Sequence, residues 1–211
     1  MSIPAEARIV LATGNQGKVR EFRALLATQP QLQDLNTEDA VIDSATAGVG
    51  DIPETGVTFE ENSLIKARAV AQQTGLPAVA DDSGLAVDVL GGAPGIFSAR
   101  WAGAQASDEN NRDLLLQQLA DISEEHRSAA FVCVASLVTP EGAEYTAYGK
   151  LEGTLLATPR GEGGFGYDPI LQPAGETRST AELSMAEKNA ISHRGKAFAA
   201  LAPHLVEVLG A

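Results

Sequence analysis

Cysteine is nearly absent from this chain: its 211 residues contain one, Cys133. A single thiol cannot form an internal disulfide, and sparse cysteine is typical of a reducing compartment. No apolar run approaches the length of about 18 residues that a membrane-spanning helix needs, and the first residues lack the pattern of a signal peptide. We therefore expect a cytoplasmic protein that does not contact a membrane.

Positive charge is also scarce. The chain has 15 Lys and Arg against 28 Asp and Glu, a net charge of −13. Nucleic-acid-binding proteins carry a basic face, so this balance argues against a DNA or RNA partner. It does not exclude a small anionic ligand, because such a ligand needs only a local cluster of lysine and arginine.

Length and composition are those of an ordinary globular protein. At 211 residues, with 44% hydrophobic residues, the chain can bury a substantial core. Domains average about 150 residues, so we expect residues 1–211 to form a single domain, which could have two lobes.

The most informative stretch begins with a short apolar run, Leu76 to Ala80, and continues with Asp81, Asp82, Ser83 and Gly84. Alternating apolar residues then predict a half-buried strand over 85–89. Two carboxylates at the end of a strand, next to a hydroxyl group, are hard oxygen ligands suited to Mg²⁺. The alternative is a plain loop, because Asp, Ser and Gly are common turn residues.

A second stretch, residues 8–18, predicts a strand, a tight loop and a helix in that order. Backbone N–H groups at the start of a helix form an anion site, and Lys18 adds a positive charge there. The loop is not a Walker A motif, because its glycine spacing is too short and Val19 stands where Ser or Thr should bind Mg²⁺. A plain loop with a surface lysine is the alternative.

The rest of the chain alternates between clear and weak patterns. Residues 28–56 are acidic and irregular, and we expect most of their charges to be solvated. Pro203 should kink or break the terminal helix. The clearer patterns predict helices over 58–74, after the cap residue Ser107 and near the C-terminus. They predict strands over 129–138, 144–149 and 152–157. Helix-capping boxes are predicted at 179–182 and 184–187.

A glycine-rich loop occupies residues 160–169. Its glycines formally match a dinucleotide-binding pattern, but Asp168-Pro169 follows where a helix should begin, so we reject that interpretation. The loop carries two aromatic residues, Phe165 and Tyr167, on which a flat ring could stack.

Four segments together resemble the inosine/xanthosine triphosphate pyrophosphatases, enzymes that hydrolyse non-standard purine nucleoside triphosphates. They are residues 13–18, 81–84, 163–169 and 188–195. The resemblance extends from about Ile9 to about Leu201 and implies an α/β fold: an elongated, twisted, mixed sheet flanked by helices, with two lobes around a central cleft. It also implies a homodimer.

The resemblance further implies the reaction of a nucleoside triphosphate with water to give the monophosphate and pyrophosphate. Asp82 matches the family's catalytic aspartate, as general base and Mg²⁺ ligand, and Glu54 matches a second metal carboxylate. Asp81 could orient Asp82 or share the metal through water, or it could be an exposed or turn-bonding residue.

The substrate-binding residues implied by the resemblance fall into two groups. The triphosphate should contact Thr13, Gly14, Asn15, Gln16, Gly17, Lys18, Lys66 and Ser83. The base should contact Phe165, Gly166, Tyr167, Asp168, Lys188, His193 and Arg194. Cationic donors such as Lys188 and Arg194 would pair with the 6-keto group of hypoxanthine or xanthine but would oppose the 6-amino group of adenine. Rejection of guanine must depend on its 2-amino group.

Two other functions are open at this stage. The chain could be a nucleotide-binding regulatory module without turnover, although a mere binder has no need of a base beside the phosphates. It could also be a metal-dependent phosphatase that acts on sugar phosphates or releases orthophosphate, and the identity of the product would distinguish it.

Overall fold

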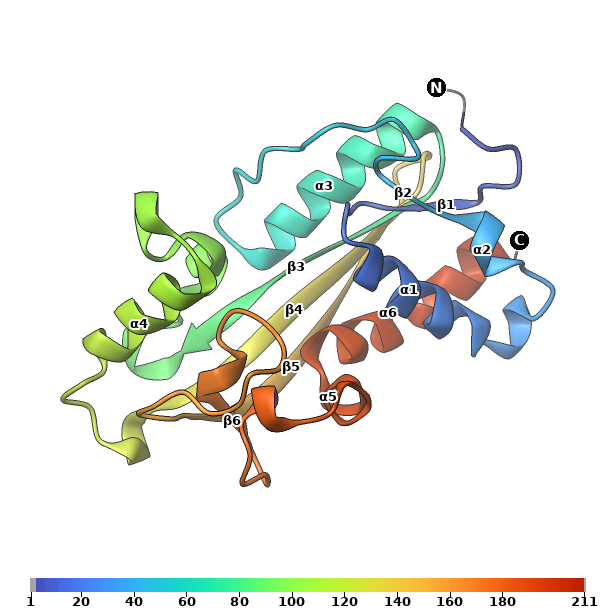
Figure 1. The fold of residues 1–211 in the computed structure, drawn as a ribbon. Helices are drawn as coiled ribbons and strands as arrows, with labels where there is room; N and C mark the ends of the chain where they lie inside the picture. The colour runs from blue at the N-terminus through green and yellow to red at the C-terminus, as the bar shows by residue number, and fades with distance from the viewer. Residues whose placement is uncertain (1–2, 211) are drawn as a thin grey trace. The chain divides into compact units, whose positions relative to one another are not determined.

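A mixed sheet of six strands, with order β2-β1-β3-β4-β5-β6, forms the framework of the protein (Figure 1). The computed structural model describes residues 3–210. Strand β1 is parallel to both β2 and β3, whereas β5 and β6 are antiparallel. The strands are β1 (Ile9–Leu11), β2 (Val41–Asp43), β3 (Ala78–Val87), β4 (Ser128–Val138), β5 (Glu144–Leu155) and β6 (Leu171–Pro173). The predicted α/β class, a mixed sheet flanked by helices, is confirmed.

The chain divides into two compact units. Unit 1 is the described part of Met1–Asp82, Val134–Tyr148 and Ala197–Ala211, and unit 2 is Ser83–Cys133 and Gly149–Lys196. The helices are α1 (Gln16–Ala27), α2 (Thr37–Ala40), α3 (Phe59–Thr74), α4 (Asp108–Gln118), α5 (Met185–Ile191) and α6 (His193–Leu209). Each boundary between the units lies inside a continuous element, β3, β4, β5 or α6.

In unit 1, apolar residues of α3 pack against the parallel strands. The residues of this core include Val10, Ala67, Val70, Ala78 and Ala80, all buried. Their small size lets a helix lie close to a sheet. Helices α1 and α6 lie side by side (Figure 1), and the rings of Phe22 and Phe198 are 5.4 Å apart between them.

In unit 2, helix α4 covers a separate core. Leu115 of α4 and Leu119, the residue that caps its C-terminus, pack with Leu85 and Val87 of β3 and with Tyr167 of the glycine-rich loop. Ser107 caps α4 by accepting a hydrogen bond from Asn110 N. Both predicted capping boxes are present, and in the second one the hydrogen bonds of Ser184 lower the pKa of Glu187 to about 2.

The Asp81–Gly84 segment corrects the sequence interpretation. Strand β3 continues through both aspartates as far as Val87, so they do not end a strand, and the turn alternative is wrong. Residues 88–90 form a 3₁₀ helix, although alternation predicts strand there. Strand alternation sends adjacent side chains to opposite faces of a sheet, which lets both carboxylates find partners without leaving the strand.

Three other predictions about elements are wrong in whole or in part. Residues 28–56 contain α2 and β2, so they are not irregular throughout. Most of their charges are exposed, as predicted, and Asp43 of β2 is the buried exception. Strand β2 has only three residues, which is too short to show an alternating pattern, so the sequence did not predict it. The two strands predicted over 144–149 and 152–157 are one strand, β5. Helix α6 continues through Pro203, so of the two alternatives predicted there, a kink or a break, the break is wrong. No helix among residues 3–210 combines the length and the apolar character needed to cross a membrane.

Candidate active site

Lys66 of α3 lies close to three acidic residues of unit 1, Glu54, Asp81 and Asp82. Its Nζ is 2.6 Å from Glu54 Oε1 and donates to the backbone oxygen of Asp81 at 2.7 Å. The same nitrogen lies 3.9 Å from Asp82 Oδ1. The sequence interpretation assigned Glu54 and Asp82 to the metal and Lys66 to the triphosphate. These three residues are neighbours in the fold, although 28 positions separate Glu54 from Asp82.

The two adjacent aspartates have different partners, as strand alternation requires. Asp81 accepts from Lys18 Nζ through both carboxylate oxygens, each at 2.9 Å, and is only 3% exposed. The alternative of an exposed Asp81 is therefore wrong. Asp82 Oδ2 instead accepts from Asn62 Nδ2 of α3, at 3.1 Å.

The loop before α1 is organised by Asn15. Its side-chain oxygen accepts from the backbone N–H groups of Gly17, at 2.8 Å, and Lys18, at 3.3 Å. Two of the amides predicted to meet an anion are thus capped by Asn15 itself. The loop therefore contributes mainly the positive charge of Lys18. It also contributes Thr13, whose hydroxyl oxygen accepts from Asn15 N.

A polar pocket of unit 1 is lined by some of the phosphate-binding candidates. Its cavity volume is about 470 Å³. Its lining includes Thr13, Gly14, Lys18, Glu54, Lys66 and Asp81. Two lysines in one pocket provide the local positive charge that a strongly acidic protein needs to hold a polyphosphate.

Gln16 lies outside this pocket. Its amide nitrogen donates to Asp43 Oδ2 at 2.5 Å, in a different pocket of unit 1 that Arg23 also lines. Partial burial raises the pKa of Asp43, but hydrogen bonds from Thr46 and Gln16 outweigh burial, and its pKa is lowered. Gln16 thus contacts a structural carboxylate in the free protein.

The residues around Asp82 fit a divalent cation. Carboxylate oxygens are the ligands that Mg²⁺ prefers, and it is commonly held by one or two carboxylates, with waters and substrate phosphates completing its shell. The Lys66 ammonium lies close to both Glu54 and Asp82, so the space between these two carboxylates already holds a positive charge. Among residues 3–210, no cluster of three or more His, Cys, Asp and Glu side chains forms a ready-made metal cage.

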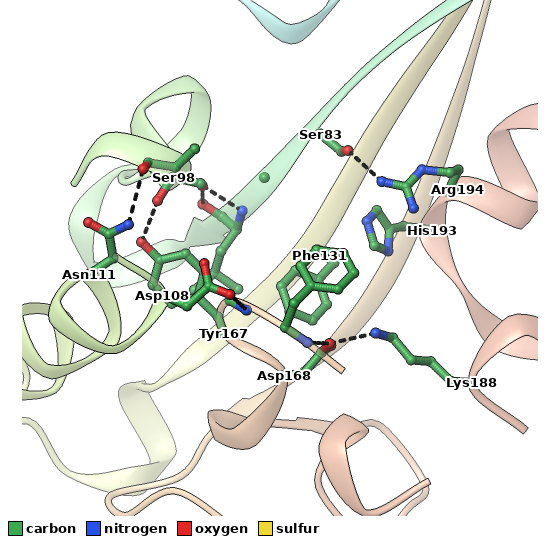
Figure 2. Close-up of a pocket in the computed structure, with 15 residues that line it drawn as sticks. Ser83, Ser98, Asp108, Asn111, Phe131, Tyr167, Asp168, Lys188, His193 and Arg194 are labelled. Atoms are coloured by element: carbon green, nitrogen blue, oxygen red, sulfur yellow. Dashed lines mark hydrogen bonds and ion pairs between the residues drawn. The ribbon is translucent and has the colours of Figure 1, made fainter. Parts of the chain in front are cut away.

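Unit 2 has its own pocket, with a cavity volume of about 150 Å³ (Figure 2). Its lining includes all the residues assigned to the base: Phe165, Gly166, Tyr167, Asp168, Lys188, His193 and Arg194. Ser83, which was assigned to the triphosphate, lines this pocket and not the one that holds Lys18 and Lys66. The pocket is mostly apolar, with charged groups at a few points, as is usual for a pocket that takes a flat organic ring.

Asp168 organises the charged side of this pocket. It is 2% exposed, and its Oδ2 accepts from Phe165 N at 2.8 Å and from Lys188 Nζ at 2.5 Å. The Lys188 ammonium also lies 4.9 Å from the centre of the Phe165 ring. Because a buried carboxylate needs such partners, Asp168 fixes the loop and Lys188 together.

The two aromatic residues of the loop differ in exposure. Tyr167 is buried, and its hydroxyl donates to Ser98 O at 2.8 Å. Burial, with the nearby negative charge of Asp108, raises its pKa. Phe165 is 65% exposed, so its ring can stack on a ligand. The buried Tyr167 ring instead forms part of the lining of the pocket.

His193 and Arg194 reach the pocket from the start of α6 (Figure 2). The His193 imidazole stacks on Phe131 of β4, with ring centres 5.2 Å apart. Arg194 Nη2 donates to Ser83 Oγ at 3.4 Å. Both side chains are held by residues distant in sequence.

Sequence reasoning missed several residues that build these sites. They are Asn62 in unit 1 and Ser98, Asp108, Asn111 and Phe131 in unit 2. Asp108 Oδ2 accepts from Gly166 N at 2.7 Å, and both ends of the Asn111 amide bond backbone groups. In the sequence these residues look like ordinary helix and strand positions, so no local signal distinguishes them.

Comparisons with known proteins show the family of this chain. The model of the Ham1 family matches residues 9–204. A dITP/XTP pyrophosphatase of Streptomyces avermitilis is 61% identical over 203 residues, covering 96% of this chain and 99% of its own. One of Geobacter sulfurreducens is 48% identical over 198 residues, covering 94% and 96%.

Solved structures give the same result for the fold. A HAM1 protein from Coxiella burnetii superposes with a TM-score of 0.85, at 44% identity, over 95% of this chain and 99% of that one. The resemblance inferred from the four segments is confirmed. Since the family model spans nearly the whole chain and full-length relatives are far more than a third identical, this protein belongs to the Ham1 family.

Proposed function

We propose that this protein hydrolyses non-standard purine nucleoside triphosphates, such as ITP, dITP and XTP, to the monophosphate and pyrophosphate. The observation that carries the proposal is the meeting of Glu54, Lys66 and Asp82, which puts two carboxylates and an ammonium group within one small space. The relatives named dITP/XTP pyrophosphatase support this reaction.

The proposed chemistry is attack of water on the α-phosphorus. Asp82 takes a proton from that water, a bond forms between its oxygen and the α-phosphorus, and the bond from the α-phosphorus to the α–β bridging oxygen breaks. Lys18 and Lys66 stabilise the negative charge that develops on the departing pyrophosphate. Lys18 then exchanges part of its contact with Asp81 for the phosphates.

A nucleotide pyrophosphatase implies a divalent metal cofactor, and we propose Mg²⁺, with Asp82 and Glu54 as the residues that would hold it. When bound, it supplies neutralising charge for the phosphates and lowers the pKa of coordinated water. The protein's own part is to keep both carboxylates close together, and in the free state the Lys66 ammonium lies near each of them.

The base is proposed to bind in the pocket of unit 2, stacked on Phe165. Lys188 and Arg194 donate to the 6-keto oxygen of hypoxanthine or xanthine. Adenine has a 6-amino donor at that position, so donors would face donors, and its binding leaves polar groups unsatisfied. Ser83 follows Asp82 directly in β3, so the chain itself links base and phosphate recognition.

The test is hydrolysis of ITP with Mg²⁺, with ATP and GTP in parallel and with both pyrophosphate and orthophosphate assayed. We expect rapid release of pyrophosphate from ITP and little from ATP or GTP. Orthophosphate as the first product would favour the phosphatase alternative. Tight binding of ITP without any product would favour a regulatory module.

Three expectations accompany the proposal. A homodimer and a cytoplasmic location stay predictions from the sequence, as does the single domain spanning residues 1–211. Light scattering of the purified protein tests the first, with twice the chain mass of 21.9 kDa as the expected result.

A further inference from the structure

Asn62 is a fully buried polar side chain that neither the sequence interpretation nor the proposed mechanism uses. It lies on α3 and is 0% exposed. A buried amide is costly unless both of its ends form hydrogen bonds. Here Nδ2 donates to Asp82 Oδ2 at 3.1 Å, and Oδ1 accepts from Gly56 N at 2.8 Å.

The direction of this amide is determined by its partners. A backbone N–H can only donate, so the oxygen of Asn62 must face Gly56. The amide nitrogen then faces Asp82, whose ionised carboxylate can only accept. Asn62 thus donates to the Asp82 carboxyl group and cannot turn its oxygen toward it without losing the Gly56 contact.

The Gly56 end of the contact reaches the segment that carries Glu54. A side chain at position 56 would have no room, because a Cβ there would lie 2.6 Å from Glu61 Cβ and 2.8 Å from Asn62 Oδ1. Glu61 Oε2 accepts from Val57 N at 2.6 Å and holds the same segment. The chain two residues after Glu54 is therefore fastened to the first turns of α3.

Lys66 lies one helical turn after Asn62, on the same face of α3. It contacts Glu54 Oε1 at 2.6 Å and lies 3.9 Å from Asp82 Oδ1. Asn62 and Lys66 therefore approach different oxygens of the Asp82 carboxylate, and each is also linked to the Glu54 segment.

We propose that Asn62 is a positioning residue that sets the orientation of Asp82 and its separation from Glu54 for a divalent cation. This inference rests on the proposed function. Asn62 acts through the two carboxylates and touches neither the substrate nor the cation. Residues that orient metal ligands typically change metal affinity or activity by about 10- to 100-fold when they are removed.

The first test compares Asn62→Ala with Ser63→Ala. Ser63 is also fully buried on α3, and its hydroxyl donates to Ala80 O at 3.0 Å, so its loss weakens the packing of the helix on β3 without touching either carboxylate. For Asn62→Ala we expect a kcat for ITP about 10- to 100-fold lower, with a KM changed less than kcat. Calorimetric titration of the free protein with Mg²⁺ should show weaker binding in proportion.

A second variant separates the two ends of the amide. Asn62→Asp keeps the shape and an acceptor for Gly56 N, but it replaces the donor to Asp82 with a like charge. A second carboxylate buried beside Asp82 is costly, so we expect a thermal midpoint no higher than that of Asn62→Ala, with a loss of kcat at least as large. This result would assign the catalytic effect to the Asp82 contact.

Two results would overturn the inference. One is an Asn62→Ala protein whose kcat and Mg²⁺ affinity match those of Ser63→Ala. The other is an Asn62→Asp protein with unaltered kcat. If the unaltered protein does not hydrolyse ITP, the proposed function fails separately, and the Mg²⁺ titration still decides whether Asn62 orients the carboxylates.

Discussion

Asp81 and Asp82 are chemically identical neighbours, but they have different surroundings. Asp81 is buried and binds Lys18 through both oxygens, whereas Asp82 is partly exposed and contacts Asn62. A buried carboxylate fully paired with an ammonium group is a poor proton acceptor, because proton uptake would leave the lysine uncompensated. The partly exposed Asp82 is therefore the better candidate base.

Asp82→Asn should abolish turnover while the protein still folds and binds nucleotide. An amide has nearly the same shape but cannot accept the proton, and general base catalysis typically contributes about 10²- to 10⁴-fold. Steady-state pyrophosphate release and calorimetric binding of ITP measure the two properties. Asp81→Asn is the control, since loss of the partner of Lys18 should lower the thermal midpoint more than Asp82→Asn does. An active Asp82→Asn protein would refute the mechanism.

Arg194→Ala should reduce discrimination between ITP and ATP. Hydrogen bonds to charged groups contribute about 1.5–3 kcal/mol, so the ratio of kcat/KM for ITP over ATP should fall about tenfold or more. Arg178→Ala is the matched control, because Arg178 pairs with Glu176 and Glu187 and does not line the pocket. If the ratio of kcat/KM for ITP over ATP is the same in Arg194→Ala as in Arg178→Ala, Arg194 does not contribute to base discrimination.

At the level of elements, the glycine-rich loop depends on one close approach. Gly164 has φ +74°, and a Cβ there would collide with the Asp168 carboxylate. That carboxylate also binds Lys188 and the Phe165 amide. The loop can therefore hold its charged and aromatic residues in place only if position 164 lacks a side chain.

Gly164→Ala should consequently be more damaging than Gly175→Ala. Both positions have left-handed backbone, but Gly175 has open space around it, so its substitution should cost only the backbone term, about 1–2 kcal/mol. Gly164→Ala adds the displacement of Asp168 and should also raise the KM for ITP. Thermal unfolding and steady-state kinetics of the pair measure both effects. Equal destabilisation with unchanged KM would show that the Asp168 contact is unimportant.

Helix α3 shows why an element can be predicted when its function cannot. Thr58 caps it, accepting from Glu61 N, and its buried residues recur at helical spacing, so its position was predicted well. Its polar residues Asn62 and Lys66 look like any other helix residues. Only the strand against which α3 packs gives them Asp81 and Asp82 as partners.

For the whole molecule, the path of the chain argues for a single cooperative unit. Domain boundaries normally fall in exposed linkers, but here all four unit boundaries lie inside β3, β4, β5 and α6. If one unit unfolded alone, β3, β4, β5 and α6 would each have to break within their own runs of backbone hydrogen bonds.

We therefore expect one unfolding transition. Scanning calorimetry should give equal calorimetric and van't Hoff enthalpies, and circular dichroism should coincide with the fluorescence of Trp101 in unit 2. Two separated transitions would mean that the units unfold independently, and the single-domain prediction would then be wrong.

The sequence alone determined the elements with local signals and the residue types that do the chemistry. Capping residues, helical spacing and turn residues act over a few positions, so α1, α3, α4 and the capping boxes could be predicted. The family motifs also named most residues of both pockets. The three-residue strand β2 and the continuity of β5 escaped, because a strand's existence depends on its neighbours in the sheet.

Only the tertiary structure decided which of those residues meet. Lys18 and Asp81 are 63 positions apart, and Arg194 and Ser83 are 111 apart. Such contacts depend on strand order and on how the helices pack, which no local pattern encodes. For the same reason the burial of Tyr167, the exposure of Phe165 and the contact of Asn62 with Asp82 appeared only in the folded protein.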